Sequence, residues 1–146
     1  MKLNQPFGSV ESEIENLDIN FKQKNYSEII ERSKGLIKKF PSIIPFYNFL
    51  GLSLQQIGKL DEAENIFSKA LFSNPNEISV LVNLSEIYRI KRNFEKSKEL
   101  LLKALSIDEN HKHTLYTLGK LTLNLNHIDQ AIKYFERLFQ IDKIGR

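Results

Sequence analysis

The chain has 146 residues, 41% of them hydrophobic and 27% charged, and its 21 Lys and Arg against 18 Asp and Glu give a net charge of +3. This size and hydrophobic fraction predict one folded domain, and the near balance of charge argues against a nucleic-acid partner. The absence of cysteine excludes disulfides, thiol catalysis and metal sites built from thiolates.

Residues 1–9 precede the first periodic segment and are expected to form an N-terminal extension. Their sequence lacks the apolar run of a secretory signal, and no stretch of the chain approaches the ~18 consecutive apolar residues that a membrane span needs. We therefore expect a cytoplasmic protein that has no membrane partner.

The segment 44–77 recurs twice, directly after itself, as 78–111 and as 112–145. Five positions show the recurrence. In 44–77 they are Leu50, Gly51, Leu60, Phe67 and Ala70; in 78–111 they are Leu84, Ser85, Phe94, Leu101 and Ala104; in 112–145 they are Leu118, Gly119, Ile128, Phe135 and Leu138. The second half of a copy is also present upstream, as Tyr26, Ile29, Leu36 and Pro41. A fixed period of this length predicts stacked helical units, here with the bounds 10–43, 44–77, 78–111 and 112–145.

The pattern within one copy is specific. It reads Tyr47, Leu50, Gly51 and Leu54, then Ala63, Phe67, Ala70 and Pro75. This spacing resembles the signature of the tetratricopeptide repeat family. The resemblance implies an all-α, right-handed superhelical solenoid of antiparallel helix pairs, with about four repeats. The first copy is degenerate, because Glu13, Asn16 and Leu17 stand where its first helix should carry the signature.

Apolar periodicity predicts eight helices. Their expected bounds are 10–23, 26–39, 44–57, 60–73, 78–91, 94–107, 112–125 and 128–141. Gly51 and Ala63 should let the two helices of a pair cross closely, because both side chains are small. Asn25 and Asn93 are the predicted N-caps of two second helices. Turns are expected at Gly58-Lys59, Arg92-Asn93 and Asn126-His127.

The sequence favours no catalytic, cofactor or metal site. It contains no nucleophile elbow, P-loop or zinc-protease motif. Residues 108–113 are the one cluster that resembles metal ligands, but a solvent-exposed turn would hold these side chains apart, and Lys112 adds a repelling charge. The basic residues around Lys91, Lys96 and Lys98 are expected to lie on a solvated convex edge. We therefore expect a protein that is not an enzyme.

In arrays of the type implied by the resemblance, the first helices of successive copies line a concave groove. The groove positions lie opposite Leu50, Leu84 and Leu118 on the helical wheel. The resulting candidate partner-binding residues are Asn48, Leu52, Gln55, Asn83, Glu86, Arg89, Tyr116, Lys120 and Asn124. Amide side chains can hydrogen-bond the backbone of an extended peptide, and Leu52 and Tyr116 offer apolar contact. The expected partner is a protein or peptide.

Two functional classes remain open. The chain could be a free-standing adaptor or scaffold, or the N-terminal recruiting domain of a longer bacterial enzyme such as a glycosyltransferase or sulfotransferase. A reading frame that continues past Arg146 would favour the second. One helix carries more apolar side chains than a single neighbour can cover. These are Ile132, Phe135, Leu138, Phe139 and Ile141. We therefore expect either that the natural chain continues and covers them or that this helix pairs with another molecule, with self-association expected for the 146 residues alone.

Overall fold

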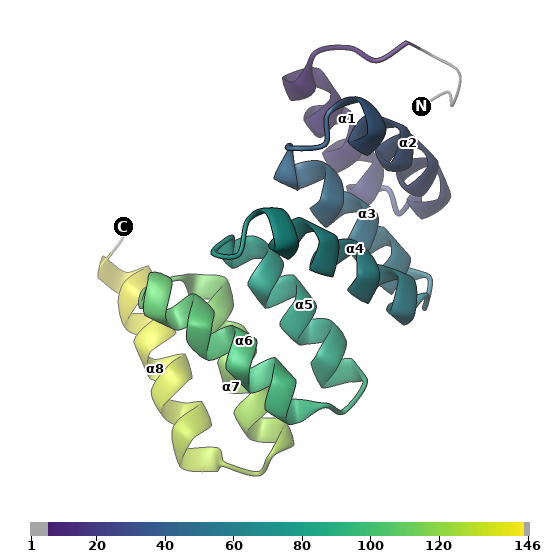
Figure 1. Cartoon of the computed structure of the whole chain (residues 1–146). Helices are drawn as coiled ribbons and strands as arrows, with labels where there is room; N and C mark the ends of the chain where they lie inside the picture. Colours follow the sequence, from purple (N-terminus) through teal and green to yellow (C-terminus); the bar gives the residue numbers. More distant parts are fainter. Residues whose placement is uncertain (1–5, 145–146) are drawn as a thin grey trace. The chain divides into compact units, whose positions relative to one another are not determined.

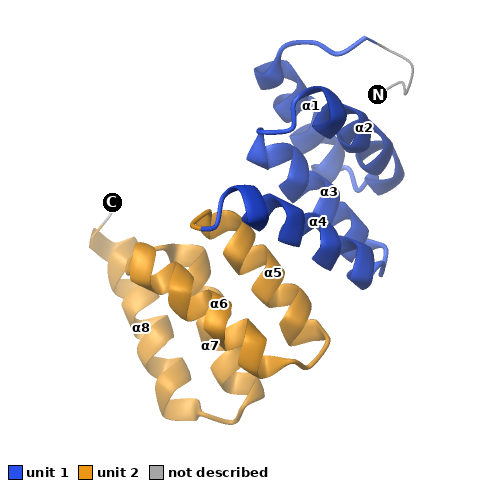
Figure 2. Cartoon of the chain, viewed as in Figure 1, with its two compact units in different colours: residues 1–75 blue, residues 76–146 orange. Residues whose placement is uncertain are grey.

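The computed structural model describes residues 6–144, which form eight helices and no strand (Figure 1). The predicted all-α tandem-repeat fold is confirmed, and seven of the eight helix bounds agree with the sequence prediction to within one residue. The helix that was expected to end at residue 141 continues to Ile144. The chain divides into two compact units, Met1–Pro75 and Asn76–Arg146 (Figure 2).

The first unit contains four helices in which each packs on its sequence neighbour and α1 also contacts α3. Their bounds are α1 Val10–Lys22, α2 Tyr26–Lys39, α3 Ile44–Gln56 and α4 Leu60–Ser73. The core of the first three helices is built from the fully buried side chains of Leu17, Ile29, Leu36 and Phe46.

The second unit repeats this arrangement. Each helix packs on the next, and α5 also contacts α7. The bounds are α5 Ile78–Ile90, α6 Phe94–Ile107, α7 Lys112–Asn124 and α8 Ile128–Ile144. The stripes of α6, α7 and α8 that face inward supply buried Leu101, Ala104, Leu115, Leu118 and Ala131. The same helix-pair geometry therefore serves both units.

The sequence of α1 lacks the signature, and a buried ion pair takes its place. Glu13 and Arg32 are only 2% and 5% exposed, and the Nε of Arg32 donates to Oε2 of Glu13 at 3.3 Å. Arg32 also donates to the Pro6 carbonyl at 3.1 Å and stacks over the Phe7 ring at 4.5 Å. This pair fastens α1 to α2, and it ties residues of the N-terminal extension to the same place.

The four turns that join the helices of a pair share one backbone conformation. Lys24, Gly58, Arg92 and Asn126 occupy the same position in successive copies, and each has a φ between 60° and 83°. The residue after each donates its N–H to a carbonyl five positions earlier, as Lys59 does to Leu54 at 2.9 Å. This is the Schellman arrangement that ends a helix in a left-handed residue. The turn prediction is confirmed, although only one copy uses glycine.

The two asparagines predicted as N-caps differ in the hydrogen bonds that their side chains make. The side chain of Asn93 accepts a hydrogen bond from the Lys96 N–H at 3.3 Å, as expected. Asn25 precedes α2, but its side chain makes no capping bond and instead donates to Asn20 Oδ1 at 3.0 Å. Asn25 therefore occupies the N-cap position of α2, as predicted, but its side chain does not cap the helix. Asn20 lies on α1, so the bond holds the turn rather than the helix start.

None of the helices within residues 6–144 has the length and apolar character needed to span a bilayer.

Candidate functional site

Five of the predicted partner-binding residues lie together on α5 and α7 of the second unit. Glu86 and Arg89 are three residues apart on α5, so they share one helix face. Tyr116, Lys120 and Asn124 follow at intervals of four on α7, which packs beside α5. Both are the first helices of their copies. These five side chains, which the helical wheel selected, therefore lie on one surface. We call this surface the α5–α7 face.

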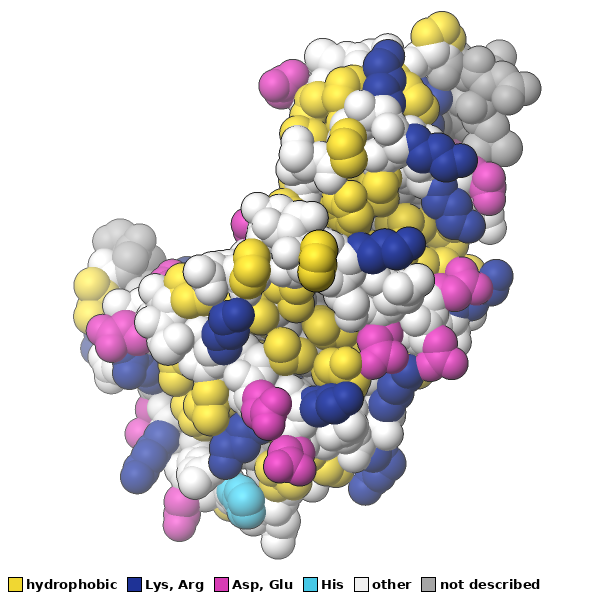
Figure 3. Space-filling model, viewed as in Figure 1, with side chains coloured by type: hydrophobic (Ala, Val, Ile, Leu, Met, Phe, Trp, Pro, Cys, Tyr) yellow, Lys and Arg dark blue, Asp and Glu magenta, His cyan; other side chains and the backbone are white. Residues whose placement is uncertain are grey.

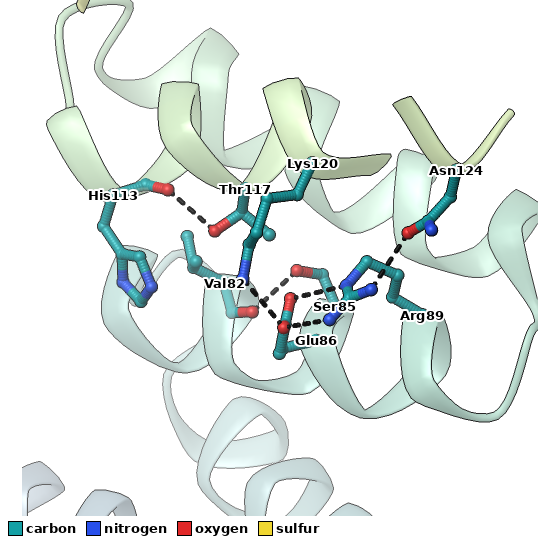
Figure 4. Close-up of polar contacts among 8 residues, drawn as sticks. All are labelled: Val82, Ser85, Glu86, Arg89, His113, Thr117, Lys120 and Asn124. Carbon is teal, nitrogen blue, oxygen red and sulfur yellow. Dashed lines mark hydrogen bonds and ion pairs between the residues drawn. The ribbon is translucent and has the colours of Figure 1, made fainter. Parts of the chain in front are cut away.

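The carboxylate of Glu86 holds this surface together (Figure 4). Its Oε1 accepts hydrogen bonds from Arg89 Nη2 at 2.6 Å and from Lys120 Nζ at 2.9 Å, and its Oε2 accepts from Arg89 Nε at 3.1 Å. Arg89 Nη1 donates in turn to Asn124 Oδ1 at 2.9 Å. One carboxylate thus orients two cations on two helices, and an amide extends the network.

The network is partly shielded from water, which strengthens its electrostatics. The Glu86 side chain is 18% exposed. Burial alone would raise the pKa of Glu86, but the hydrogen bonds and charges of Arg89 and Lys120 outweigh it and lower that pKa below its ordinary value. The bond to Glu86 correspondingly raises the pKa of Arg89. The lowered pKa keeps Glu86 ionised near neutral pH, so one carboxylate lies between two basic side chains on the α5–α7 face.

Tyr116 adds an aromatic surface to the cluster. Its side chain is 47% exposed, and the Lys120 ammonium lies 5.0 Å from its ring centroid. The ring is also tilted against Phe135 of α8, with 6.2 Å between centroids. His113, one turn earlier on α7, has its pKa lowered by burial first and then by the charges of His111 and Lys120. Near neutral pH this histidine therefore adds little charge.

Asn83 does not share the exposure of these neighbours. Its side chain is only 7% exposed, so the expectation that it is open to a partner needs correction. Val82 on α5 and Thr117 on α7 are fully buried. The Thr117 hydroxyl donates to the His113 carbonyl at 2.8 Å (Figure 4). The inner edge of the α5–α7 face is thus packed, and its outer edge carries the accessible groups.

In the first unit, the three predicted residues Asn48, Leu52 and Gln55 all lie on α3 and are half-buried. Oε1 of Gln55 is buried and has no hydrogen-bond partner among the described residues. Beside them, the Phe49 ring packs edge-on against Phe21 of α1 at 6.2 Å. The first unit therefore offers amide and apolar groups where the second unit offers charge.

Sequence reasoning identified these residues singly but missed that they form an ion network. The signal was available. Glu86 and Lys120 are opposite charges separated by one full period, so they occupy equivalent positions on neighbouring first helices. Equivalent positions on packed neighbours lie side by side in a repeat array. Glu13 and Arg32 gave no such signal, because they lie 19 residues apart and on different helices of one copy.

Residues 108–113 serve as a turn and helix start. His111 is the N-cap of α7: its Nδ1 accepts from the Thr114 N–H at 3.3 Å. Asp108 Oδ1 accepts from the Asn110 N–H at 3.0 Å. Within residues 6–144, no three His, Asp or Glu side chains gather in a way that could hold a metal ion. These polar groups thus have local structural partners.

Charges of both signs are interspersed on the side of the molecule drawn in Figure 3. The basic side chains near the α5–α6 turn lie against aromatic rings. Lys96 lies 5.3 Å from the Tyr88 ring centroid and Arg92 lies 5.3 Å from that of Phe94. Such contacts are ordinary for solvated basic side chains on helices.

Comparison with known proteins gives a consistent result. A family model described as the tetratricopeptide repeat matches residues 44–77, 78–111 and 113–144. The uncharacterized protein ycf37 of Pyropia yezoensis is 30% identical over 89 residues, which are 61% of this chain and 47% of that protein. The mitochondrial import receptor subunit TOM70 of Mus musculus is 27% identical over 126 residues, 82% of this chain and 20% of that protein. The chain spans about half the length, or less, of these curated relatives.

Solved structures share the fold. A thermophilic TPR protein of Thermus thermophilus superposes with a TM-score of 0.79 at 18% identity, over 85% of this chain and 69% of that one. MamA from Desulfovibrio magneticus RS-1 gives a TM-score of 0.73 at 15% identity, over 89% and 73% of the two chains. At such identities the likeness concerns the fold alone.

Proposed function

This chain belongs to the tetratricopeptide repeat family, and on that premise we propose that it is a non-catalytic interaction module whose α5–α7 face binds a segment of a protein or peptide partner. We assign the same role, for the first unit, to Asn48, Leu52 and Gln55 of α3. The similar proteins support a binding role. One is named as an import receptor subunit, and another, from Dictyostelium discoideum, as a subunit of the anaphase-promoting complex.

The observation that carries the proposal is the network of Glu86, Arg89 and Lys120 beside the half-exposed ring of Tyr116. Two cations share one carboxylate, so the cluster keeps an excess positive charge. Lys120 has three N–H donors and uses one on Glu86, which leaves donors for a partner. The groups are already ordered by their mutual bonds, so a partner that binds them loses less conformational entropy.

These features favour a particular partner chemistry. A carboxylate or a row of backbone carbonyls would accept hydrogen bonds from the ammonium of Lys120 and the guanidinium of Arg89. An apolar or aromatic side chain would pack on Tyr116, which presents a large surface at low entropic cost. We therefore propose an acidic segment with an apolar residue near its charge.

The test is a selection from a random peptide library displayed on phage, with the chain of residues 1–146 as bait. Selected peptides should be enriched in Asp and Glu, and their affinity should fall as salt is added. Lys120→Met and Tyr116→Ser should each weaken the selected peptides roughly tenfold, a loss of about 1.4 kcal/mol. Lys98→Met is the matched control, because Lys98 is an exposed lysine on α6.

Circular dichroism of each variant separates loss of binding from loss of fold. If the selected peptides are not acidic, or if Lys98→Met weakens them as much as Lys120→Met does, the α5–α7 face is not the binding surface.

A further inference from the structure

The helix α8 carries an apolar stripe along its length that is exposed except at Phe135, whose ring packs against α7. Ile128, Ile132, Phe135 and Phe139 are spaced by four, three and four residues, so they lie on one side of the helix. Ile132 is 48% exposed and Phe139 is 65% exposed. Together with Lys133 and Glu136, these two residues line an open hollow of about 770 Å³. Apolar side chains in such an uninterrupted row indicate an interaction surface.

The equivalent helix of the preceding copy, α6, can be compared with α8 position by position. Leu105 of α6 stands one full period before Phe139 and is half-buried, and α7 packs against α6. Lys98 of α6 stands one full period before Ile132 and is exposed. The position that is charged on α6 is thus apolar on α8. Among the described residues, α8 packs on α7 alone. Its stripe is therefore more apolar than that of α6, and no other helix within residues 6–144 packs over it.

The charges of α8 differ in whether they have partners. Those that reach the start of α7 are paired: Asp142 pairs with Lys112 at 2.6 Å, and Arg137 donates to Asn110 Oδ1 at 3.1 Å. The edge of the stripe that is turned away from α7 carries exposed charges that form no ion pair with any residue from 6 to 144. These are Asp129, Lys133, Glu136 and Lys143.

The signs along this unpaired edge alternate as minus, plus, minus, plus. When two copies of such an edge lie antiparallel about an axis between Lys133 and Glu136, each of these two residues faces the other on the second copy, and Asp129 lies within about one helical turn of Lys143 of that copy. In a parallel arrangement, like charges would face each other. A surface that is complementary to itself under a two-fold rotation is what an isologous dimer requires. The spacing of the apolar stripe also suits the packing of two long helices.

We propose that α8 is the interface through which two copies of this chain associate as an antiparallel, two-fold symmetric dimer. The stripe of Ile128, Ile132 and Phe139 forms the centre of the interface, and the alternating charges form its rim. One helix from each copy makes a small contact, so the dimer dissociates on dilution. This surface is separate from the α5–α7 face, and the proposal does not depend on partner binding there.

The test is light scattering on the chain of residues 1–146 over a concentration series. The molar mass should rise from the 17.0 kDa of one chain towards twice that value. Phe139→Glu should hold the mass at one chain throughout. Leu102→Glu is the matched control, because Leu102 is an exposed apolar residue of α6 at the position where α8 already has Glu136, and it should dimerise as the wild type does.

Charge exchange distinguishes an antiparallel dimer from any other occupant of α8. Lys133→Glu and Glu136→Lys should each raise the dissociation constant several-fold, since each places like charges opposite one another twice. The double variant should restore wild-type association. A wild type that stays at one chain at all concentrations, or a Phe139→Glu variant that still dimerises, would overturn the proposal. A double variant that associates no better than the single ones would rule out the antiparallel arrangement.

Discussion

The ring of Phe67 on α4 occupies the space that a Cβ on Gly51 of α3 would need. The same relationship recurs between Phe135 and Gly119, two copies further on. In the copy between them the corresponding residues are Leu101 and Ser85, a smaller side chain and a larger one. Helix pairs of this fold thus keep the combined size of two facing residues within narrow limits, as close packing requires.

We expect Gly51→Ser to lower the free energy of unfolding by about 1–3 kcal/mol, the usual cost of overpacking a core. Phe67→Leu alone should also destabilise, because it leaves a small cavity. The double variant recreates the Ser and Leu pair found in the third copy. Its loss of unfolding free energy should therefore be clearly smaller than the sum of the losses of the two single variants. Urea denaturation of the four proteins measures the coupling. Strict additivity would mean that the two residues do not limit how closely α3 and α4 approach.

The left-handed turn residues give a second expectation. Lys24 has a φ of 61°, a conformation that costs a residue with a Cβ roughly 1–2 kcal/mol and glycine far less. Lys24→Gly should therefore raise the free energy of unfolding by about 0.5–1 kcal/mol. Lys24→Ala removes the same charge but keeps the Cβ, so it should give no such gain.

Gly58→Ala is the converse experiment. A Cβ there meets no atom within 4 Å, so only the backbone conformation is strained. The variant should lose about 1 kcal/mol in urea denaturation. Equal stability of Gly58→Ala and wild type would show that the turns tolerate any residue.

The low pKa of Glu86 makes stability depend on pH. A carboxyl group whose pKa is lower in the folded state than in the unfolded state stabilises the fold above its unfolded pKa. This contribution is lost as the pH falls below the ordinary value of 4.5 and through the folded pKa. Glu86→Gln should therefore be less stable than wild type at pH 7, by up to about 1 kcal/mol. The difference should shrink towards pH 3. Thermal melts at both pH values test this, and a difference that grows in acid would contradict it.

The buried pair of Glu13 and Arg32 should tolerate joint replacement better than single replacement. Arg32→Met leaves a buried carboxylate without its cation and should cost about 3–5 kcal/mol. Adding Glu13→Leu removes that charge and should recover most of the loss. Urea midpoints of the single and double variants measure the recovery. A double variant as unstable as Arg32→Met would show that Arg32 acts mainly through Phe7 and Pro6.

Much of the fold could be predicted from the sequence because the period places each helix and turn. Gly51 was identified as a point of close approach from its spacing alone. The burial of Asn83 was not predicted, because a helical wheel fixes the direction of a side chain within one helix but not how closely the neighbouring helices cover it. The bond that draws the Asn25 side chain away from capping was missed for a similar reason, since its acceptor Asn20 lies in the preceding helix. Local pattern predicts elements well, and it predicts exposure only where the neighbours are known.

The ion pair that joins α1 to α2 also bears on how a chain of similar helices avoids mispairing. In the later copies, the positions equivalent to Arg32 are occupied by Ile66, Leu100 and Tyr134. A folding chain that docked α1 on α4, α6 or α8 would bury Glu13 against an uncharged side chain, at a cost of several kcal/mol. Among the second helices of the copies, only α2 has a basic side chain at the position that faces Glu13. This cost favours the native pairing of α1 with α2 over pairing with the later helices.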